Sequence, residues 1–318
     1  MKSYEHVHCP PGRSWLVSTP GVPISALPVA QIERSEIRDC RMGGRYGTRG
    51  IAMDLKSKAL VQERFGTFAA TYATSRPHAR GNSLLRLVEL VAPQASWIAL
   101  DIATGAGHVA LALAPRLAHV VASDLTPQML AVARGLARER GMANMSFVEM
   151  RAEALPFADA TFDLVTCRIA PHHFDNVSQF VVESARVLRP GGVFGLVENI
   201  SPDTSMMEGD AATLSAAADE YNAFERLRDP SHVRCLTLSE WRDLVARAGL
   251  KEQHVELLDK PMVFGPWADQ QNVGDGTKRE LVSMLCNGSA AFRAFVRPHE
   301  KNGDLDFVLA EAVIIGVK

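Results

Sequence analysis

Two aspartates and two glycines in this sequence have the types and spacing of a nucleotide-cofactor site. Gly105 and Gly107 stand in the run Ala99-Leu-Asp-Ile-Ala-Thr-Gly-Ala-Gly-His108, and Asp101 stands four residues before Gly105. Between a strand and a helix, glycines let a ligand lie against the backbone and the helix N-terminus. Asp124 closes the next predicted strand, where a carboxylate can accept hydrogen bonds from both hydroxyls of a ribose. These four residues predict a site for a cofactor that contains a nucleoside.

The glycine run is compatible with two cofactors, NAD and S-adenosylmethionine. Residues 105–110 satisfy the pattern G-x-G-x-x-A, which is typical of NAD-binding proteins. Asp101 argues against NAD, because a carboxylate there would repel a pyrophosphate but favour the cationic amino group of a methionine moiety. Asp124 indicates a ribose in either case. We therefore expect S-adenosylmethionine (SAM) and a methyl transfer; the alternatives are an NAD-linked oxidoreductase and a cofactor-binding protein without turnover.

Two adjacent histidines could supply acid–base chemistry. His172 and His173 follow the predicted strand over 162–169, at the edge of a parallel sheet where ligands bind. An imidazole titrates near neutral pH, so either histidine could remove a proton from a methyl acceptor. In the alternative, one histidine holds the loop by hydrogen bonding and the other is solvated. Clustered carboxylates and Cys/His ligand spacings are missing from the sequence, so we expect no metal.

The elements that must position these residues alternate between strand and helix. Alternation at this spacing is typical of βαβ units, which form a parallel sheet with right-handed crossovers. We predict strands over 97–102, 119–124, 145–150, 162–169 and 193–199, and helices over 57–73, 82–91, 108–117, 129–140 and 177–188.

After residue 199 the sequence pattern becomes less regular. Thr237-Leu-Ser-Glu240 has the form of a capping box, which predicts a helix that runs to about residue 248. We also predict a helix over 211–228, a strand over 254–258, a helical insertion over 278–296 and a closing strand over 307–317.

Residues 1–52 differ in composition from the rest of the chain. They are rich in Pro, Gly, Ser and Arg and have neither helical nor strand periodicity. We expect them to be either a disordered extension or the product of a start codon assigned too early, with Met53 as the true beginning. Residues 53–318 should form a single methyltransferase domain, with helical insertions around 200–235 and 264–300.

The overall composition is ordinary for a soluble globular protein. Of 318 residues, 47% are hydrophobic and 22% charged, and the formal net charge is −2, so charge gives no reason to expect nucleic acid. No run of about 18 apolar residues occurs, so we expect no membrane span. The five dispersed cysteines suit reduced thiols, which indicates a cytoplasmic protein. As its partner we expect a small-molecule methyl acceptor.

Five motifs stand in order between residues 65 and 192. They are Leu100-Asp-Ile-Ala-Thr-Gly-Ala-Gly107, Ala122-Ser-Asp-Leu-Thr-Pro-Gln-Met129, Ala152-Glu-Ala-Leu-Pro-Phe157, Phe162-Asp-Leu-Val165 and Leu188-Arg-Pro-Gly-Gly192. In this order and spacing they resemble the class I SAM-dependent methyltransferases (methyltransferase type 11), in particular the branch of ubiquinone and menaquinone C-methyltransferases. The resemblance implies an α/β, Rossmann-like, seven-stranded and mostly parallel sheet, with helices on both faces and the last strand antiparallel.

The resemblance also implies roles for individual residues. Gly105 and Gly107 would face the methionine part of SAM, and Asp124 would bind the ribose. The rest of the expected cofactor-binding set is Asp101, Thr104, Leu125, Met129 at the adenine, Ala152 and Glu153 at the adenine edge, and Arg168. The position before Ala152 is commonly acidic in the family, but here it is Arg151, which cannot accept a hydrogen bond from the adenine amine.

Three further residues are candidates for substrate contact. Tyr72 and His78 resemble the N-terminal segment that closes over cofactor and substrate in related enzymes; a helix-end loop is the alternative. His232 lies in the run Arg228-Asp-Pro-Ser-His-Val-Arg234, which resembles a small bacterial subgroup of uncertain substrate. We expect this run to border the acceptor pocket.

Overall fold

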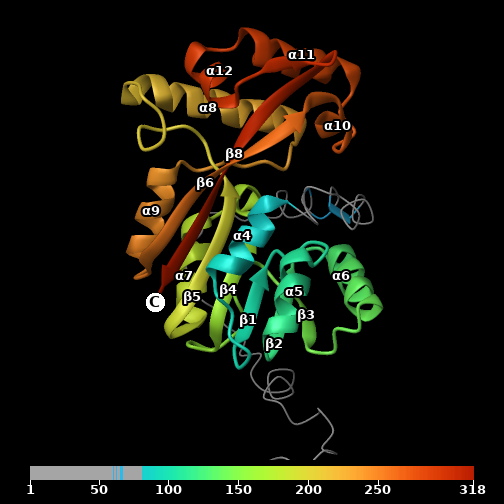
Figure 1. Ribbon diagram of the computed structural model, residues 1–318, viewed down its shortest axis with the longest axis vertical. Helices are drawn as coiled ribbons and strands as arrows, with labels where there is room; N and C mark the ends of the chain where they lie inside the picture. The colour runs from blue at the N-terminus through green and yellow to red at the C-terminus, as the bar shows by residue number, and fades with distance from the viewer. Residues whose placement is uncertain (1–59, 61, 63–64, 67–80) are drawn as a thin grey trace, which may run out of the picture. The chain divides into compact units, whose positions relative to one another are not determined.

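The computed structural model describes residues 60, 62, 65–66 and 81–318, all of which belong to one compact unit, Tyr46–Lys318. The centre of this unit is a sheet with the strand order β3-β2-β1-β4-β5-β8-β6, and β7 pairs with β8 off this path (Figure 1). The strands are β1 Ile98–Ile102, β2 His119–Asp124, β3 Met145–Glu149, β4 Phe162–Arg168, β5 Leu188–Asn199, β6 Lys251–Val263, β7 His299–Lys301 and β8 Asp304–Val317.

The directions of the strands confirm the predicted fold class. β1 pairs in parallel with β2 and β4, and β3 and β5 continue the parallel sheet on either side. The last strand, β8, is antiparallel to both of its long neighbours, β5 and β6. The main path therefore has the expected seven strands, and β7 adds a three-residue hairpin partner to β8.

Helices cover both faces of this sheet. Figure 1 shows α4 and α5 in front of the sheet and α7 behind it. The described helices are α4 Asn82–Leu90, α5 His108–Leu113, α6 Pro127–Glu139, α7 Val177–Val187, α8 Ala211–Arg228, α9 Leu238–Arg247, α10 Phe264–Asp269, α11 Asp275–Asn287 and α12 Ala290–Val296, with 3-10 turns at Ala114–Arg116 and Pro171–His173.

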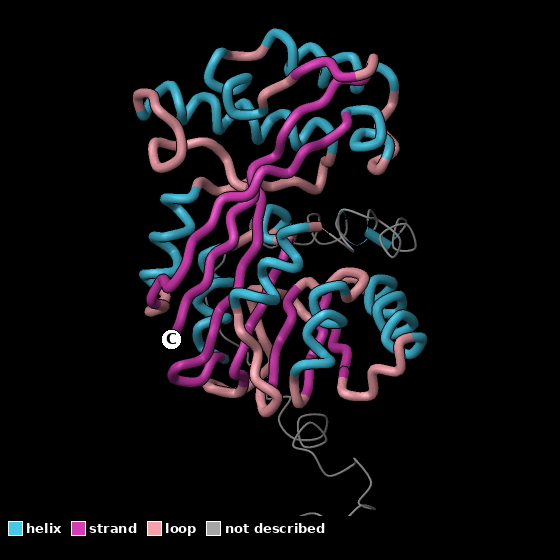
Figure 2. The backbone as a smooth tube through the Cα atoms, in the orientation of Figure 1, coloured by secondary structure: helices cyan, strands magenta, loops and turns pink. Residues whose placement is uncertain are grey.

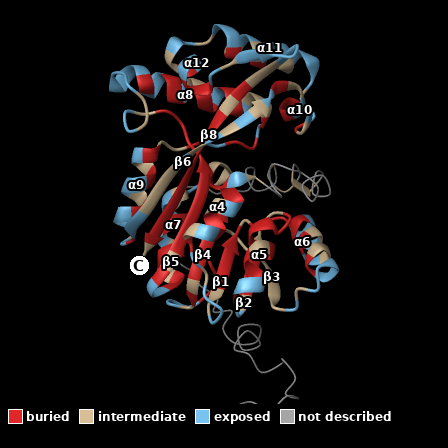
Figure 3. Cartoon of the chain, in the orientation of Figure 1, coloured by how far each residue is buried: buried red, intermediate tan, exposed pale blue. Residues whose placement is uncertain are grey.

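Two hydrophobic cores lie on opposite faces of the sheet, because successive strand residues point to opposite sides. Ala99 and Leu164 pack with the apolar sides of α4 and α5. Leu100 and Val165 face the other way and pack with α7 and α9. Figure 3 shows the result as buried strands between helices whose outer faces are exposed.

One glycine is required for the close packing of α4 on the sheet. A Cβ at Gly195 of β5 would lie 2.7 Å from a methyl carbon of Val91 and 3.0 Å from one of Leu87. Both distances are shorter than carbon atoms tolerate, so a larger residue there would push α4 away from the strands.

β6 and β8 are longer than the other strands and continue past the carboxyl ends of the parallel strands (Figure 2). Pairing between β5 and β8 ends at Asn199↔Glu311, whereas β6 and β8 stay paired as far as Val263↔Asp306. α10 follows β6 directly, α12 leads into β7 and β8, and α8 packs with α11 and α12. These four helices form a layer beyond the edge of the sheet at which parallel strands bind their ligands.

Most predicted element boundaries agree with the structure, and the differences have local causes. The helix predicted over 108–117 ends at Leu113, because Pro115 lies in a 3-10 turn over Ala114–Arg116. The strand predicted over 254–258 is the middle of β6, and the strand predicted over 193–199 begins five residues earlier, at Leu188. β7 was not predicted, α10 lies at the start of the helical insertion expected around 264–300, and the helix predicted over 278–296 is divided into α11 and α12. The helix predicted over 57–73 falls almost wholly outside the described residues.

Candidate active site

Asp101 lies at the carboxyl end of β1 and is 1% exposed. Its carboxylate accepts hydrogen bonds from the hydroxyls of Thr104 (2.6 Å) and Thr166 (2.7 Å). Burial raises the pKa of Asp101 to about 6, and the two hydroxyls only partly offset this effect. A positive group placed beside Asp101 would be attracted to its ionised form.

Asp124, the last residue of β2, fastens the glycine turn to the sheet. One carboxylate oxygen accepts from the backbone N–H of Gly105 and the other from that of Thr126, both at 2.8 Å. Each carboxylate oxygen has a second lone pair, so the side chain can still accept from two hydroxyls of a ligand. Burial raises the pKa of Asp124, which the hydrogen bonds from backbone N–H groups oppose.

The two glycines of the turn differ in what surrounds them. Gly105 has a φ of +54°, and a Cβ built on it would meet nothing within 4 Å, so this side of the turn is open. Gly107 has a φ of +85°, and a Cβ on it would lie 2.9 Å from the Cβ of Ala133 in α6. Gly105 lines a cavity at the carboxyl edge of the sheet. Gly107 does not line it and instead allows α5 and α6 to pack closely.

A single cavity runs along the carboxyl edge of the sheet and under the helix layer. Its glycine-turn end is lined by Asp101, Thr104, Gly105, Asp124, Leu125, Met129, Ala152 and Glu153, and Arg168 lies beside them. Its helix-layer end is lined by His172, His173, Asn199, Glu225, Arg228, Asp229, His232, Lys260, Met262, Trp267, Gln270 and Gln271. Apart from Gly107, every predicted site residue that the structure describes lines this cavity; Tyr72 and His78 lie outside the described residues.

Acidic neighbours surround Arg151, the residue that departs from the family pattern. Its guanidinium lies 3.6 Å from the carboxylate of Glu153 and 3.5 Å from that of Asp175. Glu153 therefore has a cationic neighbour before any ligand binds. Met129 is 2% exposed and provides an apolar surface at the same end.

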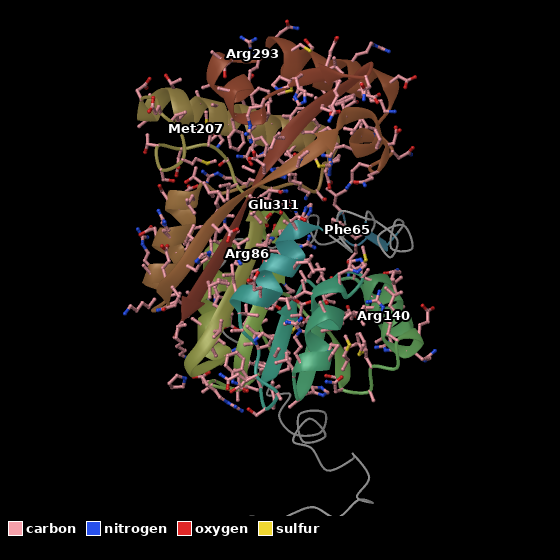
Figure 4. The ribbon with its side chains drawn as sticks, in the orientation of Figure 1. Phe65, Arg86, Arg140, Met207, Arg293 and Glu311 are labelled. Carbon is pink, nitrogen blue, oxygen red and sulfur yellow. The ribbon has the colours of Figure 1, made fainter. Side chains whose placement is uncertain are left out.

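Arg168, the last residue of β4, belongs to a charged network between the sheet and α4. Its guanidinium donates to the hydroxyl of Ser83 at 3.2 Å. Glu311 of β8, labelled in Figure 4, pairs with Lys260 of β6 at 2.8 Å and acts electrostatically on Arg168. Burial lowers the pKa of Arg168, and the negative charges of Glu311 and Asp101 counteract this.

His172 forms a hydrogen-bonded pair with Glu198, a buried residue of β5. The ring Nδ1 of His172 lies 2.8 Å from Oε1 of Glu198, and the backbone N–H of His172 donates to Oε2 at 3.1 Å. Since a carboxylate only accepts, Nδ1 carries a proton, and in the neutral ring Nε2 has the lone pair. The pKa of His172 is raised: burial acts to lower it, but the charge and hydrogen bond of Glu198, together with other acidic groups, outweigh burial.

His173 and His232 lie against His172 but are held as neutral rings. The ring centroids lie 4.1 Å and 5.5 Å from that of His172. Nδ1 of His173 lies 3.0 Å from the carbonyl oxygen of Ser231, and Nε2 of His232 lies 2.9 Å from Oδ1 of Asn222. Burial lowers the pKa of His173 to about 3 and that of His232 to about 2, and positive charge on His172 adds to both effects.

Two residues before α4 contact residues that line the cavity. The amide of Gln62 donates to the carbonyl oxygen of Leu125 at 2.8 Å. The ring of Phe65, labelled in Figure 4, meets that of His173 edge-on with centroids 5.0 Å apart. Phe65 lines the cavity beside His173.

Sequence reasoning missed Glu198, Asn199, Glu225, Lys260 and Trp267. The first had a usable signal, because a carboxylate interrupts the apolar run Val193-Phe-Gly-Leu-Val-Glu198, and such a residue is buried only with a partner. The others lie in segments without a recognisable motif, which only the folded chain brings to the cavity.

The fold and the glycine-turn end together define a class of protein. A parallel sheet with an antiparallel last strand, an open glycine turn after β1 and an acidic residue at the end of β2 are the features of a class I SAM-dependent methyltransferase. The residues present also suit the cofactor, because Gly105 leaves room beside the turn and Asp124 keeps lone pairs for a ribose.

Comparisons with known proteins agree with this class. A family model described as a methyltransferase domain matches residues 100–196. YcgJ of Bacillus subtilis, named as an uncharacterized methyltransferase, is 34% identical over 257 residues, which are 80% of this chain and 97% of that protein. Its crystal structure matches with a TM-score of 0.68 over 74% of this chain and 97% of the other. A demethylmenaquinone methyltransferase of Thermus thermophilus is 42% identical over 115 residues, 36% of this chain and 52% of that protein.

The chain belongs to the class I SAM-dependent methyltransferases, and SAM is its cofactor. The predicted methyltransferase activity is therefore confirmed at the level of the class. Among the described residues, no group of three or more His, Cys, Asp or Glu could hold a metal ion. In the same part of the chain, no helix is long and apolar enough to cross a membrane.

Proposed function

We propose that this enzyme transfers the methyl group of SAM to a C, N or O atom of a small organic acceptor, with His172 as the general base. Bound SAM would supply the activated methyl group at the glycine-turn end, and the acceptor would occupy the helix-layer end. The observation that supports this proposal is the pair of His172 and Glu198 in the cavity that contains the predicted cofactor residues.

His172 has the properties that proton removal requires. Its Nδ1 proton is engaged by Glu198, so the Nε2 lone pair can take a proton from the acceptor atom as the methyl group is transferred. The imidazolium that results would be stabilised by the carboxylate of Glu198, as an acidic partner stabilises other catalytic histidines. His173 and His232 have strongly lowered pKa values and would instead hold the acceptor and shape the cavity.

The setting of the reaction is part of the same proposal. The formal charge of −2 offers no basic excess for a nucleic acid, which favours a small acceptor. Free thiols at Cys167, Cys235 and Cys286 suit a reducing compartment, so we place the reaction in the cytoplasm.

A labelled-methyl assay tests the proposal. Wild-type enzyme is incubated with methyl-labelled SAM and a panel of metabolites, and the compound that gains the label identifies the acceptor. With that acceptor, His172→Gln should lower kcat by about 10²-fold or more, because a positioned general base contributes that much. The affinity for S-adenosylhomocysteine (SAH) should change less than about twofold, because the ring of His172 belongs to the other end of the cavity.

The exposed His299 of β7 provides a matched control, and His299→Gln should retain wild-type activity. If His172→Gln transfers the methyl group as fast as wild type, His172 is not the general base. An equal loss of SAH affinity and turnover would assign His172 to the structure of the site rather than to the chemistry.

A further inference from the structure

Three side chains at the helix-layer end bury a polar atom that has no hydrogen-bond partner in the described part of the chain. These atoms are Oδ1 of Asn199, Oε1 of Glu225 and Nε1 of Trp267. The three residues are 7%, 5% and 1% exposed, and all three line the cavity. Folded proteins pair nearly all of their buried polar groups, so three unpaired ones around one cavity require an explanation.

The packing around Trp267 holds its indole in one orientation. The indole stacks on Phe224 with ring centroids 5.1 Å apart and planes 8° from parallel, and Phe307 meets it edge-on at 4.9 Å. The guanidinium of Arg228 lies over the same indole, 4.4 Å from the ring centroid. The indole is therefore fixed, and its N–H cannot turn toward another partner.

Glu225 lies one helical turn before Arg228 on α8. One of its oxygens, Oε2, lies 4.0 Å from Nε of Arg228, which is too long for a hydrogen bond, and Oε1 has no hydrogen-bond partner among the described residues. Burial raises the pKa of Glu225, and the charge of Arg228 opposes this. A ligand group that donates a hydrogen bond to Glu225 would compensate for its loss of solvent.

The remaining lining of this end combines polar side chains with the apolar side chain of Met262. Asp229 at the end of α8, Lys260 of β6, and Gln270 and Gln271 after α10 face the same cavity. A prenyl chain placed here would leave the buried polar atoms of Asn199, Glu225 and Trp267 without a hydrogen-bond partner. A small molecule with hydroxyl, amino or carbonyl groups would supply such partners.

We infer that the acceptor is a compact polar molecule that presents N–H or O–H donors to Glu225 and Asn199 and an oxygen acceptor to Trp267. It is not a prenylated quinone, although the chain is similar over 36% of its length to a demethylmenaquinone methyltransferase. That similarity covers 115 of the 318 residues. The inference rests on the proposed function, since it names the class of acceptor for the same cavity.

A partition experiment tests the class of acceptor without knowing its identity. A bacterial cell extract is divided between aqueous methanol and chloroform, and each phase is dried and incubated with the full-length enzyme and methyl-labelled SAM. We expect label transfer to a compound of the aqueous phase. Label on a compound of the chloroform phase alone would overturn the inference while leaving the proposed methyl transfer intact. Label in neither phase would contradict the proposed function and the inference with it.

Variants of Glu225 test the proposed contact between this residue and the acceptor. The aqueous fraction serves as the source of substrate. Glu225→Met removes the acceptor oxygens at similar size, so label transfer should fall at least tenfold while SAH affinity stays within about twofold. Glu225→Gln keeps one acceptor oxygen and should lose less. The matched control is Asp219→Met, which replaces an exposed acid of the same helix and should retain wild-type transfer.

Melting with and without SAH shows that each variant is folded and competent to bind the cofactor. If Glu225→Met and Asp219→Met transfer label equally well, the contact with Glu225 is refuted. If Glu225→Met fails to fold, the comparison of Glu225→Gln with wild type decides instead, and unchanged transfer by that variant refutes the contact.

Discussion

At the scale of single residues, the buried histidines behind the proposed base couple the site to pH. His173 and His232 are neutral in the folded chain, because burial lowers their pKa values to about 3 and about 2. In the unfolded chain both would titrate near 6.5. Between these limits the unfolded state binds more protons than the folded state, so the free energy of unfolding falls as pH decreases below about 6.5.

Substitution of His232 measures how much this residue contributes to the pH dependence of the free energy of unfolding. Each such histidine changes the free energy of unfolding by up to about 1.4 kcal/mol per pH unit between its two pKa values. His232→Gln should therefore weaken the pH dependence of stability between about pH 6 and pH 4 by up to this amount. Asp101 acts in the opposite direction, since its raised pKa of about 6 favours the protonated folded state, but it acts equally in both proteins.

Urea unfolding at a series of pH values measures this difference. The prediction concerns the slope of unfolding free energy against pH, because His232→Gln will also alter the absolute stability. Identical slopes for wild type and variant would mean that His232 has the same pKa in the folded and unfolded states, which would contradict the prediction.

At the scale of elements, short-range patterns fix the ends of helices. Thr237 caps α9: its hydroxyl accepts from the backbone N–H of Glu240 at 3.2 Å, and the carboxylate of Glu240 accepts from the backbone N–H of Thr237 at 2.9 Å. The predicted capping box is thus confirmed. α9 packs on β6, the strand that also carries Lys260.

Thr237→Ala should lower the free energy of unfolding by about 0.5–2 kcal/mol, since the hydrogen bond from the backbone N–H of Glu240 to the hydroxyl of Thr237 is lost. Ser215→Ala, at an exposed position within α8, is the control and should be neutral or slightly stabilising. Denaturant unfolding followed by circular dichroism compares the two. Equal effects of the two substitutions would show that the cap adds nothing to stability.

The sequence predicted the parallel part of the sheet better than its edge, for a physical reason. Buried strands such as β1 and β4 are mostly apolar runs between turn residues, which makes their bounds visible. β6 is an edge strand with exposed and half-buried residues, and its charges at Lys251, Glu252 and Asp259 hide most of its length. The three-residue β7 is too short to have a pattern.

The two ends of the cavity also differ in how far the sequence predicts them. The glycine-turn end could be predicted because Asp101, Gly105 and Asp124 lie in continuous motifs next to strands. The helix-layer end could be predicted only in part, because its residues come from the 3-10 turn Pro171–His173, β5, α8, β6 and α10 and meet only in the folded chain. Gly107 belongs to the motif, but its role in packing against Ala133 depends on where α6 lies.

At the scale of the whole molecule, we propose that residues 53–318 are one domain and that residues 1–52 do not contribute to it. A chain that begins at Met53 should express and melt within about 2 °C of the full chain, which corresponds to less than about 1 kcal/mol at this size. Scanning calorimetry of the two chains checks this. A much larger loss of stability would show that the first 52 residues pack on the domain.

A deeper truncation serves as the positive control. A chain that begins at Gly81 also loses Gln62, which donates to Leu125, and Phe65, which packs on His173. It should bind SAH more weakly than the chain that begins at Met53. Equal affinities would show that these two contacts do not support the cavity.

The central claim for the whole molecule is that one cavity holds SAM at the glycine turn, with Asp124 on the ribose, and the acceptor under the helix layer. Titration calorimetry with SAH tests this directly on wild type, Asp124→Ala and the surface control Asp219→Ala. We expect saturable binding to wild type and to Asp219→Ala. The affinity of Asp124→Ala should fall about ten- to a hundredfold, since two hydroxyls lose a charged acceptor. Saturable binding of NAD without any response to SAH, or unchanged SAH affinity in a folded Asp124→Ala, would contradict the claim.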